Sequence, residues 1–161
     1  MKSYFKCKNF EQTIIEAKEL LDYESLNKEL KRSAKYHLAK SHLSTDNRDE
    51  ALPLLKELSK EKSDAIGAEA AYLLIEDAYD AGNFTGVQEQ TFAFSDAGSP
   101  QTYWLAKSFL ILGDSYAEEG NLEQALATFN SVKENYEPQD GGDDIAGLLK
   151  IRLDKLSKIE K

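Results

Sequence analysis

Cysteine, proline and basic charge are all scarce in this chain of 161 residues. It has one cysteine, Cys7, and three prolines. A single cysteine excludes an intrachain disulfide and a thiolate metal cluster, and few prolines favour helices over loops and edge strands. The composition therefore predicts a helical chain that is held together by packing.

The charge balance argues against two classes of partner, nucleic acids and anionic membranes. The chain carries 29 acidic and 20 basic residues, a formal net charge of −9. A nucleic-acid surface needs a basic stripe to meet the phosphates, and an anionic membrane attracts basic proteins, so both are disfavoured. No apolar run reaches the ~20 residues of a membrane-spanning helix, and residues 1–12 lack the apolar core of a signal peptide. If the chain is a fragment of a longer protein, the missing signal peptide does not show in which compartment the protein lies.

The clearest pattern runs from Trp104 to Pro138 and predicts two helices joined by a sharp turn. Apolar residues recur at helical spacing until Gly120-Asn121 breaks the pattern, as a helix C-terminus requires. The same period restarts at Leu122 and ends before Pro138. Gly113 and Ala125 are small residues at the positions where two antiparallel helices would cross closely.

The order of small and large residues in this stretch resembles the tetratricopeptide repeat, which runs through a bulky residue, Leu-Gly, Tyr, Ala, Phe, Ala and Pro. The matching residues are Phe109, Leu112, Gly113, Tyr116, Ala125 and Phe129. Val132 stands where alanine is usual, and Pro138 comes one residue late. The resemblance implies an all-α fold, a right-handed superhelix of helical hairpins.

Asparagines in the predicted turns indicate a repeat period. Asn9, Asn47, Asn83 and Asn121 are spaced by 38, 36 and 38 residues, against about 34 in the basic repeat. We interpret residues 1–161 as one domain: a half repeat at 1–23, repeats at 24–61, 63–97 and 98–138, and a capping helix at 143–160. In the repeat at 63–97 the register is open by one residue, because Ala78 or Tyr79 can take the tyrosine position.

Helix starts and chain ends give further expectations. Ser63 or Asp64 is the expected N-cap of the helix that opens the repeat at 63–97. Ser99 is expected to cap the next repeat, with Pro100 at its first helical position. Residues 1–7 leave room for only part of a first helix, and a repeat array needs capped ends, so we interpret the chain as a fragment. The final amphipathic helix is interpreted as a cap, with a partner-binding helix as the alternative.

Candidate chemical groups are few, and each has a simple structural explanation. His37 and His42 are five residues apart, whereas a helical metal site needs a spacing of four, and His42 takes the position of the repeat's tyrosine ring. Acidic pairs such as Glu118/Glu119 fall on polar faces, whereas catalytic carboxyls need a cleft that shifts their pKa. Cys7 is interpreted as an incidental thiol. We predict no enzyme activity, no metal and no cofactor.

The predicted functional surface is the concave groove, which the first helix of each pair lines in this repeat family. The candidate partner-binding residues are Tyr36, Lys40, Glu69, Tyr72, Glu76, Tyr79, Lys107 and Asp114. Tyrosine supplies contact area at low entropy cost, and carboxylates attract cations. The set predicts a partner segment with basic and apolar side chains. The alternatives are that Tyr36 and Tyr72 only pack between repeats, and that a partner binds a convex face or repeats outside this chain.

Roughly residues 68–156 resemble the C-terminal part of large tetratricopeptide-repeat proteins of Bacteroidales-type bacteria. The segments that carry this resemblance lie at 72–74, 103–109 and 143–145. They resemble, more loosely, the repeat domains of the Tol-Pal coordinating protein and of outer-membrane assembly lipoproteins. The resemblance implies a location in the bacterial periplasm or cell envelope and a scaffold with no catalysis of its own.

The sequence therefore predicts a non-catalytic module that binds a protein or peptide of open identity. Two alternatives remain. The chain could self-associate into a homo-oligomer through an apolar patch at its N-terminal end, formed by Phe5, Phe10 and Ile14. It could also be an appendage of an enzyme encoded upstream.

Overall fold

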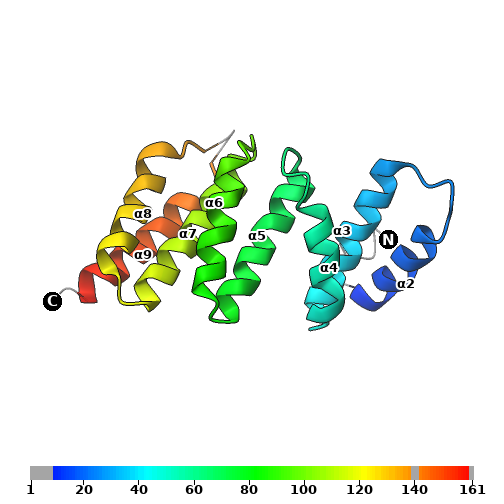
Figure 1. Ribbon diagram of the computed structural model, residues 1–161, viewed down its shortest axis with the longest axis horizontal. Coiled ribbons are helices and arrows are strands. Elements are labelled where there is room, and N and C mark those ends of the chain that lie inside the picture. Colours follow the sequence, from blue (N-terminus) through cyan, green and yellow to red (C-terminus); the bar gives the residue numbers. More distant parts are fainter. Residues whose placement is uncertain (1–8, 139–141, 160–161) are drawn as a thin grey trace. The chain divides into compact units, whose positions relative to one another are not determined.

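The computed structural model describes residues 9–138 and 142–159, and these ranges contain eight helices and no strand (Figure 1). The all-α prediction is confirmed. The helices are α2 (Phe10–Leu21), α3 (Lys28–Ser44), α4 (Arg48–Leu58), α5 (Ala65–Asp80), α6 (Phe84–Asp96), α7 (Thr102–Glu118), α8 (Leu122–Asn135) and α9 (Ile145–Ile159). The chain divides into two compact units, Met1–Glu61 and Lys62–Lys161. The division falls between the repeats predicted at 24–61 and 63–97.

In the first unit, α3 packs against both α2 and α4. Small residues at the contacts, such as Ala17, Ala34 and Ala39, are fully buried together with Leu55. Arg32 of α3 donates hydrogen bonds to the carbonyl oxygens of residues 58 and 61, at the end of α4. The arginine thus bonds one carbonyl at the end of α4 and one just beyond it, and it joins the two helices.

In the second unit, α7 is the central helix and packs against α5, α6, α8 and α9. On one side its Leu112 joins a core with Ile75 and Phe94. On the other side its Leu110 joins a core with Phe129 and Ile145, which extends to α9. The last helix thus buries its apolar stripe against the last pair, as its amphipathic pattern predicts.

Three hairpin turns share one geometry, which fixes the repeat register. In each, the backbone N–H of the turn asparagine donates to the carbonyl oxygen of the residue five positions earlier, at 2.8 or 2.9 Å. These bonds join Asn47 to His42, Asn83 to Ala78 and Asn121 to Tyr116. The residue before each asparagine has a positive φ: 59° at Asp46, 69° at Gly82 and 77° at Gly120. Ala78, not Tyr79, therefore takes the position of the repeat's tyrosine.

The same register aligns the residues at the close helix crossing. Eight residues before and after each turn asparagine lie the pairs Ala39/Leu55, Ile75/Thr91 and Gly113/Phe129, all of them buried. A Cβ atom on Gly113 would overlap three carbon atoms of the Phe129 ring. A smaller residue on one helix accompanies a larger one on the other, in either order. The small Thr91 in α6 is thus matched by Ile75 at the position that glycine occupies in α7.

The structure corrects one predicted helix start and resolves another. Asp64 caps α5, because its side chain accepts a hydrogen bond from Gly67 N–H at 2.7 Å. The helix predicted to begin at Pro100 begins instead at Thr102, with Gln101 at the N-cap position. Ser99 is used differently: its hydroxyl donates to the Lys62 carbonyl oxygen and accepts from Gln101 N–H. Since Ser99 ties this loop to the start of the unit, the helix starts two residues later than predicted.

Candidate functional site

The eight predicted groove residues all lie on first helices of hairpins, but they are divided between the two units. Tyr36 and Lys40 lie on α3 of the first unit. The other six lie in the second unit on the adjacent helices α5 and α7, and they are Glu69, Tyr72, Glu76, Tyr79, Lys107 and Asp114.

On α3 the two predicted residues contact each other. Lys40 Nζ lies 3.3 Å from the Tyr36 hydroxyl, to which it donates, and 5.3 Å from the centre of the Tyr36 ring. The two positions are one helical turn apart, so their side chains meet on one face. The Tyr36 ring also meets the edge of His37, with ring centres 5.2 Å apart.

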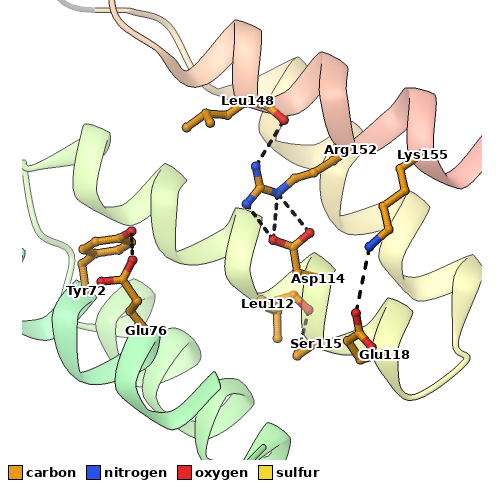
Figure 2. Close-up of polar contacts among 9 residues, drawn as sticks. All are labelled: Tyr72, Glu76, Leu112, Asp114, Ser115, Glu118, Leu148, Arg152 and Lys155. Carbon is orange, nitrogen blue, oxygen red and sulfur yellow. Dashed lines mark hydrogen bonds and ion pairs between the residues drawn. The ribbon is translucent and has the colours of Figure 1, made fainter. Parts of the chain in front are cut away.

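On α5 the equivalent pair is Tyr72 and Glu76. The Tyr72 hydroxyl donates to Glu76 Oε1 at 2.7 Å (Figure 2), and the whole tyrosine is only 8% exposed. Burial, then the hydrogen bond to the Glu76 carboxylate, raises the pKa of Tyr72 above its ordinary value. The phenol therefore stays protonated at physiological pH, and it holds the Glu76 carboxylate in place.

Lys107 of α7 lies among three aromatic rings. Its ammonium nitrogen is 4.8 Å from the ring centre of Tyr72 and 5.7 Å from those of Tyr103 and Trp104. These distances fall within the ~6 Å range of a cation–π interaction. Tyr103 and Trp104 were not among the residues predicted for the site. Their spacing was the available signal, because Lys107 lies four and three residues after them, on the same helix face.

Asp114 of α7 pairs with Arg152 of the last helix, α9. Arg152 Nε donates to both carboxylate oxygens at 3.0 and 2.8 Å, and its NH2 group is 2.6 Å from Oδ2 (Figure 2). Arg152 also donates to the Leu148 carbonyl oxygen. Burial raises the pKa of Asp114, and the Arg152 guanidinium partly offsets that rise. The predicted groove residue Asp114 is therefore engaged by the chain's own α9.

The remaining inner positions contribute less exposed surface. Tyr79 packs against Phe84, with ring centres 5.9 Å apart, and burial raises its pKa, as do the Asp114 and Glu118 carboxylates. Leu110, the α7 residue equivalent to Tyr72, is 1% exposed. The part of the predicted surface that stays accessible on α5 and α7 centres on the half-buried Glu69, Glu76 and Lys107.

Other predicted groups have structural surroundings or lie outside the described residues. His42 is 4% exposed in the first unit, as expected for a residue that replaces the repeat's packed ring. The described residues contain no cluster of three or more histidine, cysteine or acidic side chains that could hold a metal ion. Cys7 and Phe5 lie outside them, and Phe10 and Ile14, the rest of the predicted self-association patch, are half-buried on α2.

Helical hairpins with a close small–large crossing define the class of the fold, and one hairpin also matches a known family. Residues 107–137 match the tetratricopeptide repeat. The match covers most of α7 and all of α8, including the turn at Asn121 and the Gly113–Phe129 crossing. A search of curated proteins and a search of solved structures each returned no significant match. No helix in the described part of the chain is long and apolar enough to cross a membrane.

Proposed function

We propose that this chain is a non-catalytic scaffold module that binds a protein segment on the α5–α7 surface of its second unit. The tetratricopeptide match supports protein–protein interaction in general. The observation that carries the proposal is the row of fixed polar and aromatic groups on two adjacent first helices. The Tyr72–Glu76 hydrogen bond and the contact between the Tyr72 and Trp104 rings hold these groups before a partner arrives. A surface that needs little reordering loses little entropy on binding.

The charge distribution supports a basic partner. Residues 62–161 carry 18 acidic and 8 basic side chains, whereas residues 1–61 carry 11 and 12. The second unit thus accounts for the negative charge of the whole chain. Such a surface attracts a basic segment and repels an acidic one, which affects association rate and specificity more than affinity.

We further propose that this module is part of a longer protein of the bacterial cell envelope. The segments at 72–74, 103–109 and 143–145 support a place within a longer envelope protein, because they resemble such proteins of Bacteroidales-type bacteria. Tyr36 and Lys40 are proposed as contacts of the first unit, in which they occupy the positions equivalent to Tyr72 and Glu76.

The test is affinity capture from a bacterial envelope extract with the 161-residue chain and two single variants. Glu69→Lys reverses a charge on the proposed surface, whereas Glu89→Lys makes the same change on the exposed part of α6. We expect a partner that the parent and Glu89→Lys capture and that folded Glu69→Lys loses. A partner that Glu69→Lys retains in full would move the binding site away from the α5–α7 surface.

A further inference from the structure

The three rings around Lys107 form a compact aromatic cluster that two helices build. Tyr72 comes from α5, and Tyr103 and Trp104 come from α7. The ring centres of Tyr72 and Trp104 are 5.4 Å apart, and Tyr103 meets Trp104 edge-on at 4.9 Å. We call Tyr72, Tyr103 and Trp104 the aromatic cage.

Both tyrosines of the aromatic cage are fixed at their hydroxyl ends by carboxylates. Tyr72 donates to Glu76 at 2.7 Å, and Tyr103 donates to Asp144 Oδ1 at 3.0 Å. Each hydrogen bond restricts the rotation of its ring and polarises the phenol toward the phenolate, which enriches the ring in electrons. Electron-rich faces held in a fixed arrangement bind cations more strongly.

The present occupant of the aromatic cage is held by the rings alone. Within the part of the chain that the structure describes, Lys107 makes cation–π contacts with all three rings but no hydrogen bond or ion pair. Lysine is a compact charge on a flexible stem. The ammonium can therefore leave the rings without breaking a salt bridge, and another cation can take its place.

We propose that the aromatic cage is a binding site for a cationic side chain of the partner, a lysine or a methylated lysine, and that Lys107 occupies it when the partner is absent. This inference rests on the proposed function of the α5–α7 surface. The acidic groups near the cage favour a cation over an anion: Glu76 and Asp144 bond its tyrosines, and Glu69 acts on Tyr103 electrostatically. A quaternary ammonium group suits such a site best, because it is weakly hydrated and its methyl groups can lie against the ring faces.

The only tryptophan of the chain lies in the cage, so its fluorescence reports on occupancy. The 161-residue chain is titrated with tetramethylammonium chloride against sodium chloride at equal ionic strength. Lys107→Met keeps most of the stem and removes the internal cation, and Lys133→Met makes the same change on an exposed position of α8. We expect Lys107→Met to bind tetramethylammonium at least about fivefold more tightly than the parent. Lys133→Met should bind it with the same affinity as the parent.

Two further variants complete the test. Adding Tyr103→Leu to Lys107→Met removes one wall of the cage and should abolish the response. Lys107→Gln replaces Lys107→Met if the latter loses helical circular dichroism. Equal tetramethylammonium affinity in the parent and the Lys107 variant would overturn the proposal. So would a parent that responds to sodium acetate and loses that response in Lys107→Met, because the site would then bind anions through the lysine.

The experiments can contradict the cage proposal and the proposed binding surface independently of each other. If Glu69→Lys loses the captured partner but Tyr103→Leu retains it, the α5–α7 surface binds without the cage, and the cage proposal is wrong. If tetramethylammonium binds as expected but Glu69→Lys still captures the partner, the cage is a cation site and the binding surface is wrong.

Discussion

Gly113 lacks a side chain because the Phe129 ring fills the space that a side chain would need. A Cβ atom there would overlap Cε1, Cδ1 and Cζ of the ring, which is itself fully buried. A side chain at position 113 would therefore have to displace the ring or push the two helices apart.

Gly113→Ala should therefore destabilise the second unit by roughly 1–3 kcal/mol, the usual range for overpacking, and Gly113→Leu should destabilise it more. Urea unfolding followed by Trp104 fluorescence measures the change. Adding Phe129→Leu to Gly113→Ala creates the pair that Ala39 and Leu55 form at the equivalent positions. The double variant should recover part of the loss. A Gly113→Ala variant as stable as the parent would contradict the close crossing.

This crossing could be predicted from the sequence because it depends on side-chain volume at helical spacing. Gly113, Ala125 and Phe129 are small and large at the positions that the repeat requires. The Lys107 contact was less accessible to prediction, since it depends on a rotamer and on the Tyr72 ring of another helix. The helix start predicted at Pro100 was wrong because Ser99 bonds a carbonyl 37 residues away, which local capping rules do not include.

At the scale of elements, α9 is joined to α7 by two ion pairs in addition to its apolar stripe. The side chains of Arg152 and Asp114 are 21% and 25% exposed. The second charged pair between these helices, Lys155–Glu118, is longer, at 4.0 Å, and exposed. Only the first pair is sheltered enough to matter for stability, because exposed pairs are screened by solvent.

Arg152→Met should destabilise the second unit by about 1–3 kcal/mol, since it leaves a largely buried carboxylate without its partner. Adding Asp114→Leu should restore much of that loss, because a matched apolar pair has no charge to desolvate. Urea unfolding of both variants gives the values. Lys150→Met is the control on the same helix, because its 3.7 Å contact with Asp154 is exposed at both ends. An Arg152→Met variant no less stable than this control would show that the pair contributes nothing.

The sequence predicted that α9 exists and that it is amphipathic, but not which groove residue it would engage. Asp114 was interpreted as a contact for a partner rather than for Arg152 of α9. The two residues are 38 positions apart, and their meeting depends on how the helix docks, which the pattern within either helix does not specify.

At the scale of the whole molecule, the two units differ in how they should respond to acid. In the first unit both ring nitrogens of His42 are buried and have no hydrogen-bond partner among the described residues. Burial foremost, then the Lys18 charge on α2, lowers the pKa of His42, and Glu50 on α4 opposes that shift. Its folded pKa therefore lies below the unfolded value of about 6.5.

Above about pH 6.5 His42 is neutral in both states and has no effect on stability. As the pH falls through that value, the unfolded chain takes up a proton that the folded unit does not, so stability is lost. In the second unit the pKa of Asp114 is raised, which acts in the opposite direction, since the unfolded chain then holds fewer protons than the folded one.

Lowering the pH from about 7.5 to about 5.5 should thus lower the urea midpoint followed by circular dichroism more than the midpoint followed by Trp104 fluorescence. The two probes separate because the single tryptophan lies in the second unit. His42→Phe, which restores an aromatic ring at the repeat's tyrosine position, should reduce the shift in the dichroism midpoint. If the dichroism midpoint of His42→Phe shifts with pH as much as that of the parent, groups other than His42 cause the loss of stability in acid.

The turns at Asn83 and Asn121 also affect how the number of hairpins in such a chain can change during evolution. In each, the asparagine backbone N–H bonds to the residue five positions earlier, and its side chain accepts from the N–H three residues later. All the bonds that shape the turn therefore lie within nine consecutive residues. A recombination event between the two asparagine codons would add or remove 38 residues in frame and leave every remaining turn intact. Gene duplication can therefore lengthen or shorten this scaffold one hairpin at a time.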